Sequence, residues 1–137
     1  MRSVFTDAFY WIALANLRDD WHDRVLDFSR QHLANARLIT TDEVLTEFMT
    51  FFAPTGAEGR TLVVNFLKKI RLNPNVQVIP QTRQTFDAAL ELFEQRADKT
   101  YSLTDCGSMR IMQNLGLNEV LTHDPHFRQE GFTILFP

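Results

Sequence analysis

Several residue types are scarce in this chain, and each shortage excludes a class of protein. Its 137 residues include only five glycines and five prolines, too few for a collagen-like or low-complexity chain. The one cysteine, Cys106, can form no internal disulfide, which favours a reducing cytoplasm. No apolar run approaches the roughly 20 residues of a membrane span, so we expect no membrane partner.

What remains is the composition of an ordinary globular protein. A hydrophobic content of 45% is typical of a chain that buries one core, and residues 1–137 are predicted to form a single domain. A domain of this size needs neither a metal nor a disulfide to fold. The net charge of −3 neither indicates nor excludes RNA, because a basic face can lie on a mildly acidic body.

The N-terminus superficially resembles a secretory signal, because Arg2 precedes the apolar run Ala8–Ala15. Asp7 interrupts the apolar stretch, however, and only one basic residue stands ahead of it. We therefore expect a cytoplasmic protein without a signal peptide.

Short β-rich runs alternate with longer segments of helical periodicity. The expected strands are 4–6, 38–40, 76–79, 120–122 and 132–136. The breaker cluster 53–59 predicts a turn between two helices. This alternation predicts a three-layer α/β/α fold, in which helices cover both faces of a mainly parallel sheet of four to five strands. The apolar helix stripes expected in the core are Trp21, Val25 and Phe28; Phe86, Ala89, Leu90 and Phe93 within 82–97; and Met109, Met112 and Leu115 before Gly116.

Acidic residues follow the expected strands or open the next helix. In an open α/β sheet, ligands bind beyond the carboxyl ends of the strands. Asp7 follows the first strand, Asp124 follows the fourth, and Asp105 opens the helix after residues 101–104. Asp105 also shares a helix face with apolar residues, where an unpaired carboxylate is costly. These three acids are therefore candidates for a shared site.

Two glutamates in the helix after the second strand compete for a place beside these acids. Glu47 falls on the edge of the buried arc of that helix, whereas Glu43 points almost opposite to it. We therefore expect Glu47 to reach over the sheet edge into the shared site and Glu43 to be solvated. The arc, at about 100° per residue, comprises Val44, Leu45, Phe48, Phe51 and Phe52.

Each acid also has a purely structural interpretation. Asp7 and Asp124 stand where helix N-caps stand, and Pro125 suits the first helical position. Ser102 and Asp105 match a capping box. Taken together, however, four carboxylates from four segments would repel one another at one sheet edge unless cations are bound. Carboxylate oxygens suit Mg²⁺ or Mn²⁺, so the pattern favours a metal site.

Four segments carry these acids in order along the chain. They are Phe5-Thr6-Asp7, Thr40-Thr41-Asp42-Glu43-Val44-Leu45-Thr46-Glu47, Ser102-Leu103-Thr104-Asp105-Cys106 and Leu121-Thr122-His123-Asp124-Pro125-His126-Phe127. These segments resemble the motifs of PIN-domain ribonucleases, and the nearest type is the VapC-like toxin of bacterial toxin–antitoxin pairs. The resemblance spans essentially the whole chain, through Gly131-Phe132 before the last strand. It implies a compact α/β/α fold and a metal-dependent endoribonuclease.

The resemblance also implies the site and its partners. It places the site of Mg²⁺ or Mn²⁺ on Asp7, Glu47, Asp105 and Asp124. Because we expect strand ends to hold Asp7 and Asp105, these two would be the central ligands, and Glu47 and Asp124 would complete the shell or orient the water. The reaction would hydrolyse RNA phosphodiester bonds and leave a 5′-phosphate and a 3′-hydroxyl. A small antitoxin in the groove beside the acids and a homodimer are the implied partners. Two departures are visible: Ala8 replaces a Ser or Thr found in many relatives, and no further acid closely follows Asp124.

Positive charge near an acidic pocket would contact the phosphates of RNA. Residues 60–71 contain four basic residues and no acid, although a solvated helix face would have the same composition. The candidates there are Arg60, Lys68, Lys69 and Arg71, alternating with the expected core positions Leu62, Val63, Phe66, Leu67 and Ile70. Further candidates, near the acidic motifs in sequence, are Arg110, His123, His126 and Arg128.

Weaker patterns are assigned structural roles. His123 and His126 flank a helix start and lack a thiolate cluster, which favours capping or surface roles over zinc. Cys106 has no histidine partner nearby in sequence, so a buried thiol is favoured over a nucleophile. An aromatic cluster near the N-terminus is expected in the core, although an exposed part could form a dimer face; its members are Tyr10, Trp11 and Trp21.

Two other functions are compatible with the sequence. A PIN-like scaffold could bind RNA or a protein without cutting RNA, in keeping with Ala8 and the missing further acid. A phosphatase or receiver-like domain with a phosphate-accepting Asp is less well supported, because no Asp-x-Asp motif follows the first strand. No glycine-rich loop follows that strand either, which disfavours a nucleotide-cofactor enzyme.

Overall fold

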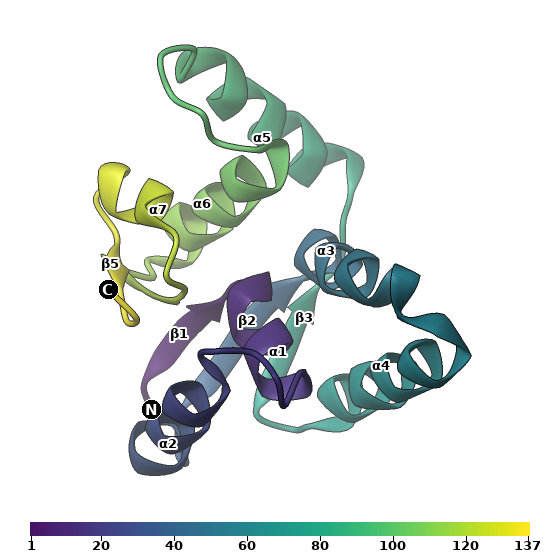
Figure 1. Cartoon of the computed structure of the whole chain (residues 1–137). Coiled ribbons are helices and arrows are strands. Elements are labelled where there is room, and N and C mark those ends of the chain that lie inside the picture. The colour runs from purple at the N-terminus through teal and green to yellow at the C-terminus, as the bar shows by residue number, and fades with distance from the viewer.

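A computed structural model describes all of residues 1–137, and a five-stranded sheet lies at its centre (Figure 1). The strands lie in the order β3-β2-β1-β4-β5, and every neighbouring pair is parallel. The expected parallel sheet of four to five strands is therefore confirmed. Its strands are β1 Ser3–Thr6, β2 Arg37–Thr41, β3 Val76–Ile79, β4 Glu119–Leu121 and β5 Thr133–Ile134.

Helices make every connection between the strands. Two long helices join each of the first three strand pairs in sequence, and one short helix joins the last pair. In chain order they are α1 Ala8–Ala15, α2 His22–His32, α3 Asp42–Phe52, the 3-10 helix η1 Ala53–Thr55, α4 Gly56–Leu72, α5 Arg83–Gln95, α6 Leu103–Leu115 and α7 Pro125–Gln129.

The strand order fixes which helices cover which face. The chain steps from β1 to β2 to β3 in one direction, and then crosses back beyond β1 to β4 and β5. Because parallel crossovers are right-handed, this reversal puts α1 to α4 on one face and α5 to α7 on the other. Figure 1 shows α1 and α2 in front of the strands, and α5, α6 and α7 gathered together in the upper part of the view. The predicted α/β/α layering is confirmed.

The reversal of direction creates a crevice between the carboxyl ends of β1 and β4. Ligands of open α/β sheets bind at such a switch point. Asp7 directly follows β1, and Asp124 lies three residues after the end of β4. The topology therefore brings two of the four predicted acids to one place.

One predicted helix stripe is rotated from its expected orientation. Leu90 and Phe93 of α5 are about half exposed, whereas Ala89 and Leu92 are buried. Ala89 packs close to Gly107 of α6, so the buried line of α5 runs along its contact with α6. The expectation was right for Ala89 and wrong for Leu90 and Phe93, because α5 carries apolar residues on two adjacent faces and α6 covers only one of them.

Three further residues expected in the core are about half exposed. Phe51, Leu62 and Leu115 lie on the outer side or at the end of α3, α4 and α6. The inner side of each of these helices is already filled, by Phe48 and Phe52, by Val63 and Ile70, and by Met109 and Met112. Tyr10 and Trp11 are buried as expected, and Trp21 is half-buried.

The predicted turn between two helices is present but short. After η1, helix α4 begins at Gly56, whose φ of +85° suits glycine because it has no Cβ. The predicted last strand is also short, although the backbone amides of Leu135 and Phe136 still donate to carbonyls of residues 120 and 122. None of the helices combines the length and apolar character that crossing a membrane requires.

Candidate active site

Asp7 is a nearly inaccessible carboxylate at the end of β1, with an exposure of 6%. Its Oδ2 accepts a hydrogen bond of 2.8 Å from the hydroxyl of Thr122, so this bond joins the ends of β1 and β4. Burial raises the pKa of Asp7 from 3.8 to about 7, against the lowering effect of the Thr122 hydrogen bond. The charges of Asp105 and Glu47 raise it further. Asp7 stands at the N-cap of α1 but makes no side-chain capping bond there.

Asp105 reaches the site from the start of α6. The prediction that a strand end holds it is wrong, because residues 96–102 between α5 and α6 form no strand. Instead, the predicted capping box positions it: the Ser102 hydroxyl accepts from the Asp105 backbone N–H at 3.0 Å, and Asp105 Oδ2 accepts from the Ser102 backbone N–H at 3.1 Å. Asp105 is 8% exposed, so its carboxylate is both a cap and a buried charge.

Asp124 and His126 approach Asp105 from the start of α7. Asp124 is the N-cap of α7, as the sequence predicts: its Oδ1 accepts a hydrogen bond of 2.9 Å from the backbone N–H of His126. The His126 ring turns back over this cap, with Nδ1 3.2 Å from Oδ2 of Asp105 and 3.4 Å from Oδ1 of Asp124. One ligand atom of each of these three residues lies within 4.8 Å of the others, close enough to hold one metal ion.

The two glutamates of α3 behave differently from each other. Glu47 is exposed and lies near the cluster: partial desolvation raises its pKa, and the charges of Asp105 and Asp124 raise it further. Glu43 was expected to be solvated, and this is wrong. It is half-buried with an unpartnered Oε1, and its other oxygen packs against Gly107 of α6. Glu43 is half-buried because α6 packs against α3 at this point.

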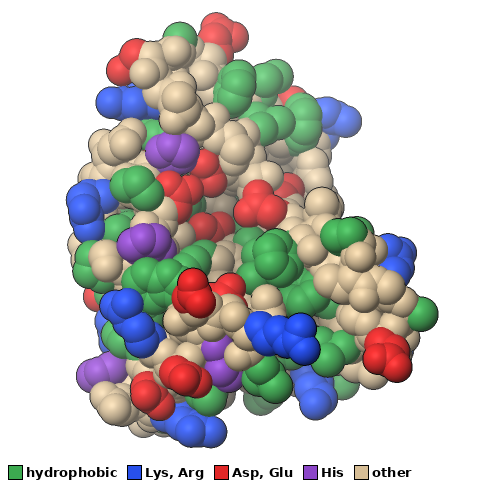
Figure 2. All heavy atoms as spheres, in the orientation of Figure 1, with side chains coloured by type: hydrophobic (Ala, Val, Ile, Leu, Met, Phe, Trp, Pro, Cys, Tyr) green, Lys and Arg blue, Asp and Glu red, His purple; other side chains and the backbone are tan.

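No Lys or Arg side chain lies within 4.0 Å of the carboxylates of Asp7, Glu47, Asp105 or Asp124. Figure 2 shows acidic side chains gathered around a hollow in this face of the molecule, with a histidine beside them. Carboxylates that raise one another's pKa without a cationic partner fit a divalent cation, which needs several oxygen ligands. The donor set therefore suits the metal site that the sequence predicts.

Two of the cationic candidates are engaged elsewhere. Arg110 of α6 pairs with Glu91 of α5 at 3.2 Å and donates to the Ala88 carbonyl. His123 has Nδ1 2.7 Å from the Phe136 carbonyl oxygen, and its ring packs on Trp21 at 4.6 Å. His123 and His126 thus face different neighbours, so they do not form a shared zinc pair.

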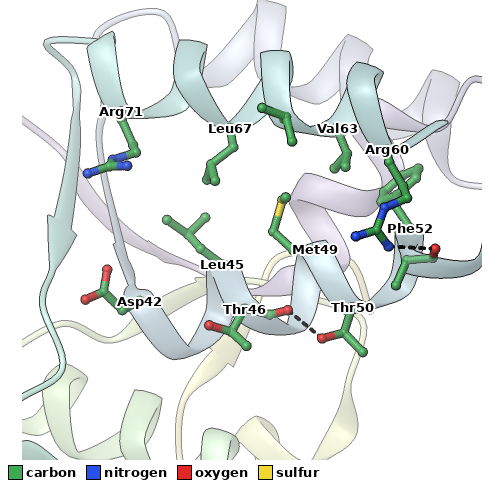
Figure 3. A pocket seen from close by; sticks show the side chains of 12 residues that line it. Asp42, Leu45, Thr46, Met49, Thr50, Phe52, Arg60, Val63, Leu67 and Arg71 are labelled. Atoms are coloured by element: carbon green, nitrogen blue, oxygen red, sulfur yellow. Dashed lines mark hydrogen bonds between the residues drawn. The ribbon is translucent and has the colours of Figure 1, made fainter. Parts of the chain in front are cut away.

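The remaining cationic candidates are exposed. Lys68 and Lys69 lie on α4 and Arg128 lies on α7. Arg60 donates to the Ala53 carbonyl at 3.0 Å, at one end of a cavity of about 640 Å³ between α3 and α4, and Arg71 lies at the other end (Figure 3). None of the four acids lines this cavity, so the cavity and the acidic cluster are separate features.

Sequence reasoning missed Thr122 and gave His126 a different role. Thr122 carries no signal beyond its place at a strand end, and only the strand order shows that it faces Asp7. For His126 a signal existed, because a residue two positions after an N-cap Asp can fold back toward the helix start. Cys106 is fully buried, and burial raises the pKa of its thiol, in agreement with a structural role.

No protein-family model matches the sequence, and no curated protein matches it. Solved structures do match. VapC20 of Mycobacterium tuberculosis, a toxin that cleaves the sarcin–ricin loop, superimposes with a TM-score of 0.83 and 25% identity over 95% of this chain and 96% of that chain. VapBC2 from Rickettsia felis, bound to a promoter DNA fragment, gives a TM-score of 0.65 and 13% identity over 96% of both chains.

FitAcB from Neisseria gonorrhoeae gives a TM-score of 0.66 and 12% identity over 96% of this chain and 95% of that chain. At these identities VapBC2 and FitAcB show a shared fold alone, whereas VapC20 matches more closely over nearly the whole of both chains. The expected resemblance is confirmed: this chain has the α/β/α fold of the PIN-domain toxins of the VapC type.

Proposed function

We propose that this protein is a metal-dependent endoribonuclease and the toxin of a toxin–antitoxin pair. The observation that carries the proposal is the convergence of four carboxylates, from four segments, at the switch point of a parallel sheet without any Lys or Arg partner. Carboxylates that repel one another destabilise the fold, so capping roles alone do not account for this arrangement. A bound divalent cation would offset the repulsion.

Each acid has a role in this proposal. Asp7 and Asp105 would be the central ligands of Mg²⁺ or Mn²⁺, and Glu47 and Asp124 would complete the shell or orient the attacking water. When bound, the cation would supply Lewis-acid stabilisation of the charge on the phosphoryl group and would acidify water. Thr122 would hold the Asp7 carboxylate in one orientation through its hydroxyl, and Ser102 would do the same for Asp105 through the capping box.

The substrate would be RNA. The sarcin–ricin loop activity of VapC20 supports this class of substrate, and the exposed basic residues of α4 and α7 would contact its phosphates. VapBC2 and FitAcB are toxin–antitoxin complexes, which supports a separate antitoxin protein as partner. A homodimer, a cytoplasmic location and a single domain over residues 1–137 belong to the same proposal.

The experiment is cleavage of mixed cellular RNA by the purified protein, free of any co-purifying partner, with and without Mg²⁺ or Mn²⁺. Wild type should give discrete fragments only with metal, and Asp7→Asn and Asp105→Asn should give none while remaining folded. Asp87→Asn is the matched control, because Asp87 is an exposed acid on α5. Cleavage that persists in both site variants would contradict the mechanism. RNA that stays intact with wild type in every condition would favour the non-cutting scaffold.

A further inference from the structure

His126 is the one nitrogen base within the acidic cluster. Its Nδ1 lies 3.2 Å from Oδ2 of Asp105 and 3.4 Å from Oδ1 of Asp124. Adjacent ligands of an octahedral cation with bonds of about 2.1 Å lie about 3.0 Å apart. Nδ1 therefore lies from each carboxylate oxygen at about the distance between neighbouring ligands of one ion, and a modest side-chain adjustment would bring ligand atoms of all three residues, now within 4.8 Å of one another, around that ion.

The other ring nitrogen of His126, Nε2, is hydrogen-bonded to a side chain outside the cluster. Nε2 lies 3.0 Å from the hydroxyl oxygen of Thr100. If Nε2 carries the proton and donates it to Thr100, the lone pair of Nδ1 faces the two carboxylates. Histidines that bind metals are oriented in this way, by a hydrogen bond from the nitrogen that does not touch the ion.

The loop and helix around His126 hold the ring in place. The Tyr101 ring packs against it at 5.4 Å, and the Tyr101 hydroxyl donates to Glu130 at 3.0 Å. Arg96 donates to both carboxylate oxygens of Glu130. This chain of contacts ties α7 to the segment that precedes α6, so that His126 and Asp105 stay side by side.

The chemistry of the donor set decides which ions the centre would favour. Carboxylates bind Mg²⁺ and Mn²⁺ alike, but imidazole is a good ligand for first-row transition metals and a poor one for Mg²⁺. We infer that His126 is a nitrogen ligand of the divalent cation held by Asp105 and Asp124, and that the centre consequently selects Mn²⁺ over Mg²⁺. This inference rests on the proposed function and specifies the metal of that same site.

Pulsed electron paramagnetic resonance of the metal-stripped full chain, reloaded with Mn²⁺, tests the inference directly. Wild type should show the hyperfine coupling of a coordinated nitrogen. The coupling should disappear in His126→Asp and in His126→Asn, and it should persist in His32→Asn, a matched control on the exposed end of α2. Near-ultraviolet circular dichroism establishes which variants keep the fold, and the two substitutions provide independent tests.

Competition titrations give a second readout that does not depend on activity. The ratio of Mn²⁺ to Mg²⁺ affinity should fall at least about tenfold in His126→Asp, because an oxygen ligand replaces the nitrogen. Mn²⁺ bound without nitrogen coupling, or an unchanged ratio, would overturn the inference and leave the nuclease proposal standing. Failure of wild type to bind either ion would overturn both.

Discussion

Asp7 is a carboxylate that folding removes from water. Burial raises its pKa from 3.8 to about 7, so the folded chain holds a proton at this site between about pH 4 and pH 7 that the unfolded chain has released. The contribution of Asp7 to stability is therefore fully present below about pH 4 and is lost as the pH rises through about 7. The difference between the two pKa values corresponds to about 4 kcal/mol, an upper bound for one carboxylate.

The substitution Asp7→Asn removes the free-energy cost of burying an ionised carboxylate at high pH, because an amide carries no charge. In chelator at pH 8 the variant should be more stable than wild type, by up to about 4 kcal/mol, and near pH 4 the two should be equal. Thermal unfolding at pH 4, 6 and 8 measures the difference. Added Mn²⁺ should stabilise wild type more than the variant, because the variant keeps the ligands of the Asp105, Asp124 and His126 cluster but lacks this carboxylate. Equal stability of the two proteins at pH 8 in chelator would contradict the burial argument.

For single residues, the sequence predicted where the acids stand in the fold better than it predicted which side chains surround them. Asp7 and Asp124 could be predicted because strand ends and N-cap residues leave local signals. Thr122 could not, since its partner Asp7 is 115 positions away and only the strand order brings them together. Glu43 was misjudged because its burial depends on α6, which a helical-wheel argument for α3 does not include.

The capping boxes at the starts of α5 and α6 are a matched pair of elements. Thr82 and Ser102 each accept a hydrogen bond of 3.0 Å from a backbone N–H three residues later. Only the second box contains a candidate ligand, Asp105, as its reciprocal partner. The two helix starts are therefore equivalent for stability and different for function.

Replacing either cap by alanine should cost about 1 kcal/mol, measured by urea unfolding. Ser102→Ala should also weaken Mn²⁺ binding severalfold in calorimetry, because the turn that fixes Asp105 loses its hydroxyl partner. Thr82→Ala should leave the metal affinity at the wild-type value. Equal loss of affinity in both variants would show that general loosening of the helices, rather than the position of Asp105, sets the affinity.

Helix existence followed from periodicity, whereas helix orientation did not. The helix within 82–97 was predicted almost to its ends and Ala89 is buried as expected, but Leu92 is buried in place of Leu90 and Phe93. A helix with apolar residues on two faces leaves the choice to its neighbour, here α6. Asp105 was expected at a strand end and instead follows the connection between α5 and α6.

At the scale of the whole molecule, the four candidate acids have no Lys or Arg partner, and the lysines of α4 come from a different element. The four acids gather at the carboxyl end of the sheet, where the strand order reverses, while Lys68 and Lys69 extend from α4. RNA that enters the acidic site would need such cations nearby, since the chain as a whole carries a net charge of −3. Binding should therefore depend strongly on salt.

The double variant Lys68→Gln, Lys69→Gln tests whether α4 contributes to that binding. In the non-cleaving Asp105→Asn background, the slope of log affinity against log salt for single-stranded RNA should become shallower by about 0.7 for each lost phosphate contact, or about 1.4 in total. The control is the double variant Arg30→Gln, Arg37→Gln. Arg30 lies near the end of α2 and Arg37 begins β2, at the amino ends of the strands and so away from the acids at their carboxyl ends. That control should keep the wild-type slope. An equal change in both variants would indicate that net charge alone governs RNA binding, and an unchanged slope in the lysine variant would place the phosphate path away from α4.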